Sequence, residues 1–193
     1  MILLLSSVVV GVVAGRFLNF QVPDNLFTIL LMILVFVVGI DIGSEENILK
    51  KIKVNLKIIV LQSFFMMVGS LVVVSIVSFF TQLTLKESLL AASGFGWYSL
   101  SAIMITDLYS PLLGAISFTS NVIREVIAIV IIPIAAKFSK LGAVSIAGAT
   151  SMDTLLGIIS KSTDKESTLI GFGQGVIVSS CVPLVISLIY NLL

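Results

Sequence analysis

Three charged side chains stand inside apolar stretches of this sequence, where a charge needs a reason. Arg124 and Glu125 lie side by side near the middle of the apolar run 112–136, and Asp153 lies in a shorter apolar run. About 20 apolar residues are enough to cross a bilayer. A charge at the bilayer centre costs about 2.5 kcal/mol or more, so such residues usually face a bundle interior or a water-filled cavity. We therefore expect a substrate or ion site inside the membrane.

The chemistry available to these three side chains is binding rather than bond breaking. Each carboxylate could take a proton, a sodium ion or a substrate amine, and the planar guanidinium of Arg124 could receive a substrate carboxylate. Alternatively, Arg124 and Glu125 each satisfy a partner on a neighbouring helix and hold the bundle together. Asp153 could instead cap a helix that resumes at Thr154, although a serine would cap at less electrostatic cost.

Other polar and aromatic residues accompany the charges. On a helix, Ser117, Asn121 and Glu125 are four residues apart and form a polar stripe. Trp97 and Tyr98 are either membrane-interface residues or the wall of a cavity, and their place well inside an apolar segment favours the cavity. Our candidate substrate- or proton-binding residues are Glu125, Asp153, Arg124, Asn121, Ser99, Tyr98, Trp97, Thr150, Ser151 and Gln174.

Composition excludes several classes of protein. Hydrophobic residues make up 58% and charged residues 11% of the chain, whereas about a quarter of a soluble domain is charged. The net charge of +1 gives no support for nucleic-acid binding. The sequence has no histidine and one cysteine, Cys181, which removes histidine-dependent nucleophiles, the commonest zinc sites and any disulfide within the chain. We expect a multi-pass membrane protein that is not an enzyme and needs neither metal nor cofactor.

Seven apolar segments must position these residues. We expect an all-α helical bundle that forms a single membrane transporter domain over residues 1–193, with about five transmembrane helices and two broken or re-entrant segments. The segments are 1–15, 26–42, 56–80, 88–109 (broken), 112–136, 143–160 (broken) and 168–192. Glycine and serine, for example Ser93, Gly94 and Gly96, favour broken helices, which membranes tolerate where protein or water covers them.

Lysine positions orient the bundle. The loop 41–57 and the lysines that follow segments 112–136 and 143–160 are expected on the cytoplasmic side. Each broken segment must then enter and leave the membrane on one side, the two from opposite sides, with the N-terminus inside and the C-terminus outside. Residues 88–136 and 143–192 would form an inverted repeat, the architecture of many secondary transporters. The evidence for the repeat is that the two breaks align in small residues. Small residues are common in membrane helices, so a chance match is the alternative explanation.

Three elements together resemble the lysine exporter LysO family. They are residues 92–101 (ASGFGWYSLS), the Asn121-x-x-Arg124-Glu125 element and residues 148–153 (GATSMD), and their order and spacing agree with that family. The resemblance implies export of L-lysine, and of its toxic analogue thialysine, across the cell membrane of a prokaryote. It also implies dependence on intramembrane acidic residues, at the positions of Glu125 and Asp153.

The chain departs from the family pattern in two places. Typical members carry additional N-terminal membrane helices, so the resemblance implies a separately encoded small membrane subunit or self-association. In relatives a proline follows the Asp153 element, and we expect Gly157 to shape the break here instead.

Exporting a cation against an inside-negative potential costs roughly 2.3 kcal/mol per 100 mV. We therefore expect an antiporter coupled to entering protons, or to sodium ions, in which Glu125 and Asp153 bind substrate amines and protons in turn. Arg124 would receive the substrate carboxylate or anchor Glu125. One alternative class is a channel or a non-transporting assembly subunit. A less favoured alternative is an intramembrane aspartyl protease, because neither aspartate in the broken segments has the Gly-x-Gly-Asp motif that such a protease needs.

Overall fold

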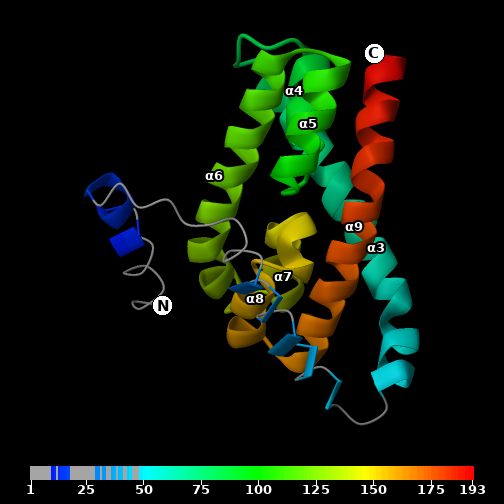
Figure 1. Cartoon of the computed structure of the whole chain (residues 1–193). Coiled ribbons are helices and arrows are strands. Elements are labelled where there is room, and N and C mark those ends of the chain that lie inside the picture. The colour runs from blue at the N-terminus through cyan, green and yellow to red at the C-terminus, as the bar shows by residue number, and fades with distance from the viewer. Residues whose placement is uncertain are drawn as a thin grey trace.

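A computed structural model describes residues 48–193 continuously, together with scattered residues before them: 10–11, 13–17, 29–30, 32–33, 36–37, 39–40 and 43–44. The expected segments 1–15 and 26–42 therefore lie largely outside the described residues. From residue 48 onward the chain is helical and contains no strand (Figure 1). The all-α prediction is confirmed.

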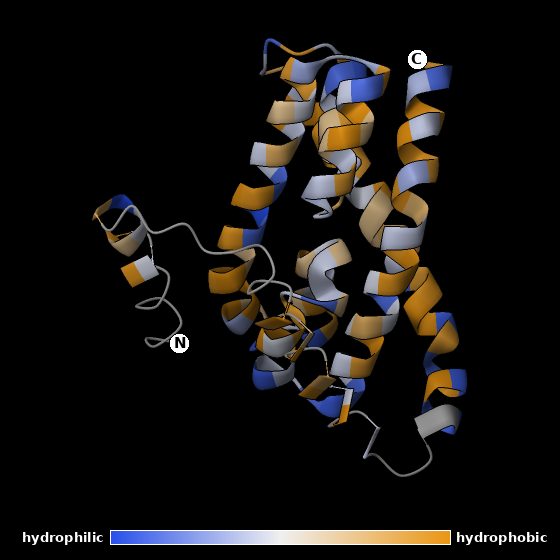
Figure 2. Cartoon of the chain, in the orientation of Figure 1, coloured by the Kyte–Doolittle hydropathy of each residue, from blue (hydrophilic) through white to orange (hydrophobic). Residues whose placement is uncertain are grey.

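Three long helices and two pairs of short ones make up the described bundle. The elements are α3 (Ile48–Ser78), α4 (Leu85–Ala92), α5 (Tyr98–Leu108), α6 (Pro111–Ala135), α7 (Lys140–Ala147), the 3₁₀ helix η1 (Gly148–Met152), α8 (Leu156–Ser162) and α9 (Lys165–Leu192). Within residues 48–193, α3, α6 and α9 are long and apolar enough to cross a membrane. Figure 2 shows them hydrophobic over most of their length, with a hydrophilic patch about halfway along α6.

Short polar side chains fix where the helices begin. Ser110 accepts a hydrogen bond from the Leu113 backbone N–H at the start of α6, where Pro111 supplies a helix-compatible φ angle. Ser139 caps α7 in the same way. Asp164 accepts from the Ser167 N–H, 2.7 Å away, and so begins α9.

The pairs α4–α5 and α7–α8 are re-entrant hairpins from opposite ends of the bundle (Figure 1). The two ends of the first hairpin meet where the Tyr109 hydroxyl donates to the Glu87 carboxylate at 3.1 Å. The second hairpin begins beside the start of α9, where Lys140 and Asp164 form an ion pair of 2.6 Å. Each broken segment thus returns to the end from which it entered, as the lysine positions predicted.

The hairpins pack into separate apolar cores. One core joins α4 and α5 to the second half of α9 through residues such as Leu90, Ile105 and Val182. The other joins α7 and α8 to α6 and includes Ile132 and Ile159. The space between the two cores is where the breaks meet.

Two details differ from the sequence-based expectation. Helix α3 begins at Ile48, so Lys50, Lys51 and Lys53 lie in its first turns rather than in a loop. Lysine is a good helix former whose long side chain can reach the interface from inside a helix. The prediction that Gly157 shapes the second break is wrong. Gly157 lies within α8, and the bend occurs at Gly148, where φ is +62°.

Candidate substrate site at the crossing of two broken helices

The two breaks touch through their backbones. The Ala149 N–H donates a 2.9 Å hydrogen bond to the carbonyl oxygen of Phe95. Phe95, Gly96 and Gly148 all have positive φ angles. A Cβ on Gly148 would stand 2.6 Å from Nη1 of Arg124, so only glycine fits both the turn and the close approach.

Polar residues of α6 bond the backbone groups that the first break leaves free. Arg124 Nη1 donates to the Phe95 carbonyl at 2.6 Å. The side-chain oxygen of Asn121 accepts from the Gly96 N–H at 2.8 Å, and the Ser117 hydroxyl donates to the Ala91 carbonyl at 2.9 Å. These bonds let irregular backbone exist at membrane depth.

The second break is held in the same manner by α9 and by its own hydroxyl groups. The amide of Gln174, which is fully buried, donates to the Val144 carbonyl at 3.1 Å and accepts from Gln62 of α3 at 3.0 Å. The Ser151 hydroxyl lies 2.7 Å from the Gly171 carbonyl. Thr150 donates to the carbonyl of Ala147, three residues earlier.

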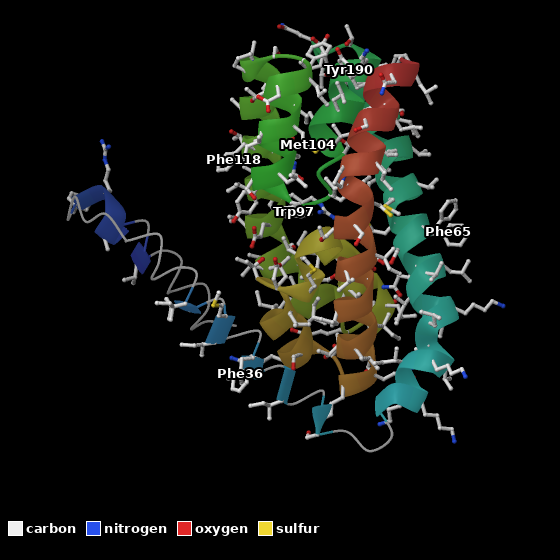
Figure 3. All side chains as sticks on the ribbon, turned by 45° about the vertical axis from the view of Figure 1, so that its right-hand side comes forward. Phe36, Phe65, Trp97, Met104, Phe118 and Tyr190 are labelled. Carbon is white, nitrogen blue, oxygen red and sulfur yellow. The ribbon has the colours of Figure 1, made fainter. Side chains whose placement is uncertain are left out.

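A cavity of about 210 Å³ lies between the breaks. Both hairpins and α9 contribute to its wall, which consists of Gly96, Trp97, Tyr98, Ser99, Ala149, Thr150, Met152, Asp153, Thr154 and Ser179. Figure 3 shows Trp97 about halfway along the bundle, where the hairpin tips approach each other. The cavity is smaller than the roughly 300–1,000 Å³ typical of drug-sized ligands, so it suits a small solute.

Asp153 and Tyr98 line this cavity, and Glu125 lies near both of them. The charges of Glu125 and Asp153 lie close enough to act on each other and on the Tyr98 hydroxyl. Asp153 accepts from the Thr154 N–H at 2.6 Å, and the Tyr98 ring packs edge-on against Phe118 at 5.4 Å. Both carboxyl groups are only half-buried. This arrangement is rich in acceptors, as a site for an ammonium group must be.

Arg124 is not among the residues that line this cavity. Although Arg124 and Glu125 are neighbours in the described part of the chain, the structure shows no ion pair between their side chains. Arg124 instead lines two adjoining hollows between α3 and α6. Ser70 and Ser120 line both hollows with it. Arg124 and Asp153 therefore line different hollows.

The structure sorts the residues proposed from sequence into two groups. Trp97, Tyr98, Ser99, Thr150 and Asp153 line the cavity, and Glu125 stands beside it. In contrast, Arg124, Asn121, Ser151 and Gln174 bond the backbone of the breaks.

Sequence reasoning missed Ser179. It follows Gly175 by one helical turn, on the face of α9 that approaches η1 closely, since a Cβ on Gly175 would stand 2.6 Å from the Met152 Cβ. That spacing was the available signal.

Comparison with known proteins assigns the family. The lysine exporter LysO family matches residues 5–190. A putative lysine exporter of Haemophilus influenzae is 33% identical over 187 residues, which cover 95% of this chain and 94% of that protein. Lysine exporter LysO of Escherichia coli is 33% identical over 188 residues, which cover 95% of this chain and 62% of the relative. No solved structure gives a significant match. The chain belongs to the lysine exporter LysO family.

Proposed function

We propose that this chain is a secondary antiporter that exports L-lysine in exchange for entering protons. The observation that carries the proposal is that Asp153 lines the cavity and that Glu125 lies beside it, near Asp153. One carboxylate comes from α6 and the other from the second break. Two acidic groups inside a membrane are costly unless they bind cations or protons. The family is one of transporters rather than enzymes, which agrees with such a role.

Lysine matches this cavity chemically. Its two ammonium groups would bind between the carboxylates, and the faces of Trp97 and Tyr98 would add cation–π attraction. When lysine leaves on the outer side, protons would neutralise Glu125 and Asp153 and allow the empty site to return. Thialysine carries the same amines and carboxylate, so it would follow the same route. A sodium ion in place of the proton is the alternative coupling ion.

The proposed orientation in the cell membrane follows from the lysines. The start of α3 meets the start of α9 where Asn55 donates to the Glu166 carboxylate at 3.0 Å. The start of α7 reaches the same end through the Lys140–Asp164 ion pair. Lysines of three elements thus gather at one end, which we assign to the cytoplasm. The C-terminus would then face outward and the N-terminus inward.

We also propose that the chain works with a separately encoded small membrane subunit or as a homo-oligomer. The apolar part of α3 is only 17% buried within the described residues. Lipid or a neighbouring helix must cover it. Cross-linking in native membranes, followed by mass measurement of the product, identifies which neighbour is present.

Transport in proteoliposomes tests the proposed function. Vesicles loaded with labelled lysine should lose it against a lysine gradient when the outside is acidic, which a channel cannot do. Glu125→Gln and Asp153→Asn should abolish this export, whereas Asp107→Asn, at an exposed position near the end of α5, should leave it unchanged. Normal export by both folded cavity variants would refute the mechanism.

A further inference from the structure

A groove beside the crossing has the opposite chemistry from the cavity. We call it the α3–α6 groove. It consists of the two adjoining hollows, of about 420 and 550 Å³, that share Ser70, Ser120 and Arg124. Ser145 of α7 lines the larger hollow, and Phe95 of the first break lines the smaller. No carboxylate is among the residues that line either one.

Within residues 48–193, some hydrogen-bond donors of this groove have no acceptor, although the Ser120 hydroxyl donates to the Ser117 carbonyl at 3.0 Å. A guanidinium carries five N–H donors, and the hydrogen bond that Arg124 makes within the described chain is the one to Phe95. The Ser70 hydroxyl reaches only the thioether sulfur of Met66, 3.7 Å away, and the Ser145 hydroxyl has no partner among residues 48–193. Within the described part of the chain, several N–H and O–H donors around this positive charge therefore have no acceptor.

A positive charge at this depth needs a partner. Arg124 lies near the middle of α6, where acyl chains would be the alternative occupant of the groove. Facing a guanidinium toward hydrocarbon is unfavourable. The neighbouring Glu125 does not supply that partner, because its carboxylate lies near Asp153 and Tyr98 at the cavity. An anion would satisfy the charge and the Ser145 hydroxyl, and would offer Ser70 a better acceptor than the Met66 sulfur. A carboxylate fits a guanidinium in a bidentate geometry.

We propose that the α3–α6 groove is a second substrate site, which holds the carboxylate of the transported amino acid on Arg124, Ser70 and Ser145. The inference rests on the proposed function, because that function supplies an amino acid as the ligand. The groove selects for a carboxylate and the cavity selects for amines. A diamine without a carboxylate would fit the cavity and not the groove.

Thiol labelling tests the groove without relying on transport. Ser145→Cys is introduced into a Cys181→Ala background and treated with methanethiosulfonate reagents that carry either a sulfonate or a trimethylammonium group. The local field of Arg124 should make the sulfonate reagent react about 10-fold faster. Lysine should slow that reaction, whereas cadaverine, the diamine that lacks the carboxylate, should not. Ser70→Cys provides a second thiol in the groove if the first variant fails to fold.

The cavity supplies the matched control. A thiol introduced by Ser179→Cys should prefer the cationic reagent, and both lysine and cadaverine should slow its labelling. Equal rates for the two reagents at both groove thiols, or equal protection by lysine and cadaverine there, would overturn the groove proposal. If wild-type vesicles export no lysine while the groove thiols show the expected pattern, the proposed function fails and the carboxylate site stands.

Discussion

Nη1 of Arg124 lies 2.6 Å from the carbonyl oxygen of Phe95 and donates a hydrogen bond to it. The same carbonyl accepts the Ala149 N–H at 2.9 Å. One oxygen atom therefore joins α6 to the tips of both re-entrant hairpins. Arg124 holds the crossing together, and any role in binding substrate depends on the donors that this bond leaves free.

Removing the guanidinium should loosen the crossing. We expect Arg124→Gln to lower the melting temperature in detergent and to reduce export strongly, because a hydrogen bond from a charged group contributes about 1.5–3 kcal/mol. Arg124→Lys keeps the charge but not the planar fork, so it should restore stability in part. An Arg124→Gln variant that unfolds at the wild-type temperature would show that the bond to Phe95 is not important.

Two glycines of α9 provide a matched pair of variants. A Cβ on Gly175 would stand 2.5 Å from the Met152 backbone nitrogen, whereas a Cβ on Gly171 would meet nothing closer than 3.4 Å. Gly175→Ala should therefore push η1 away from α9 and cost about 1–3 kcal/mol. Gly171→Ala should be neutral or slightly stabilising, because alanine is the better helix former. Thermal unfolding of both variants in detergent tests this difference. Equal melting temperatures would contradict the close packing of Gly175 against Met152.

The sequence was enough to locate the breaks but not their contacts. Small residues such as Gly94 and Gly148 indicated irregular backbone. The lysine positions predicted that each broken segment returns to the side from which it entered. The partner of Arg124 could not be foreseen, because Phe95 lies 29 residues away in the chain and meets it only through tertiary packing. Ser179 was missed because its only sequence signal was its spacing of one helical turn from Gly175.

The ion pair that closes the second hairpin should respond to pH. Lys140 donates a hydrogen bond to Asp164, and together with the Ser167 N–H it lowers the pKa of that carboxyl to about 2. The pKa of an unfolded aspartate is about 3.9, so the stabilisation is complete above that pH and is lost as the pH falls toward 2. Both side chains are about half exposed, which limits the contribution of the pair to about 1 kcal/mol.

Asp164→Ser isolates this contribution, because serine keeps the helix cap and removes the charge. The variant should melt below wild type by the same amount at pH 7 and pH 5, and the difference should shrink below pH 4. A difference that persists undiminished near pH 2 would show that the carboxylate charge is not its source.

Trp97 is the only tryptophan of the chain and lines the cavity, so its fluorescence tests the two-carboxylate site directly. Titration of the purified protein with lysine should give a saturable change in Trp97 emission. Glu125→Gln and Asp153→Asn should each raise the half-saturating concentration at least about 10-fold, as expected for losing one charge-assisted hydrogen bond. Asp107→Asn should leave it unchanged. Wild-type half-saturation in both folded cavity variants would contradict the claim that Glu125 and Asp153 bind the substrate.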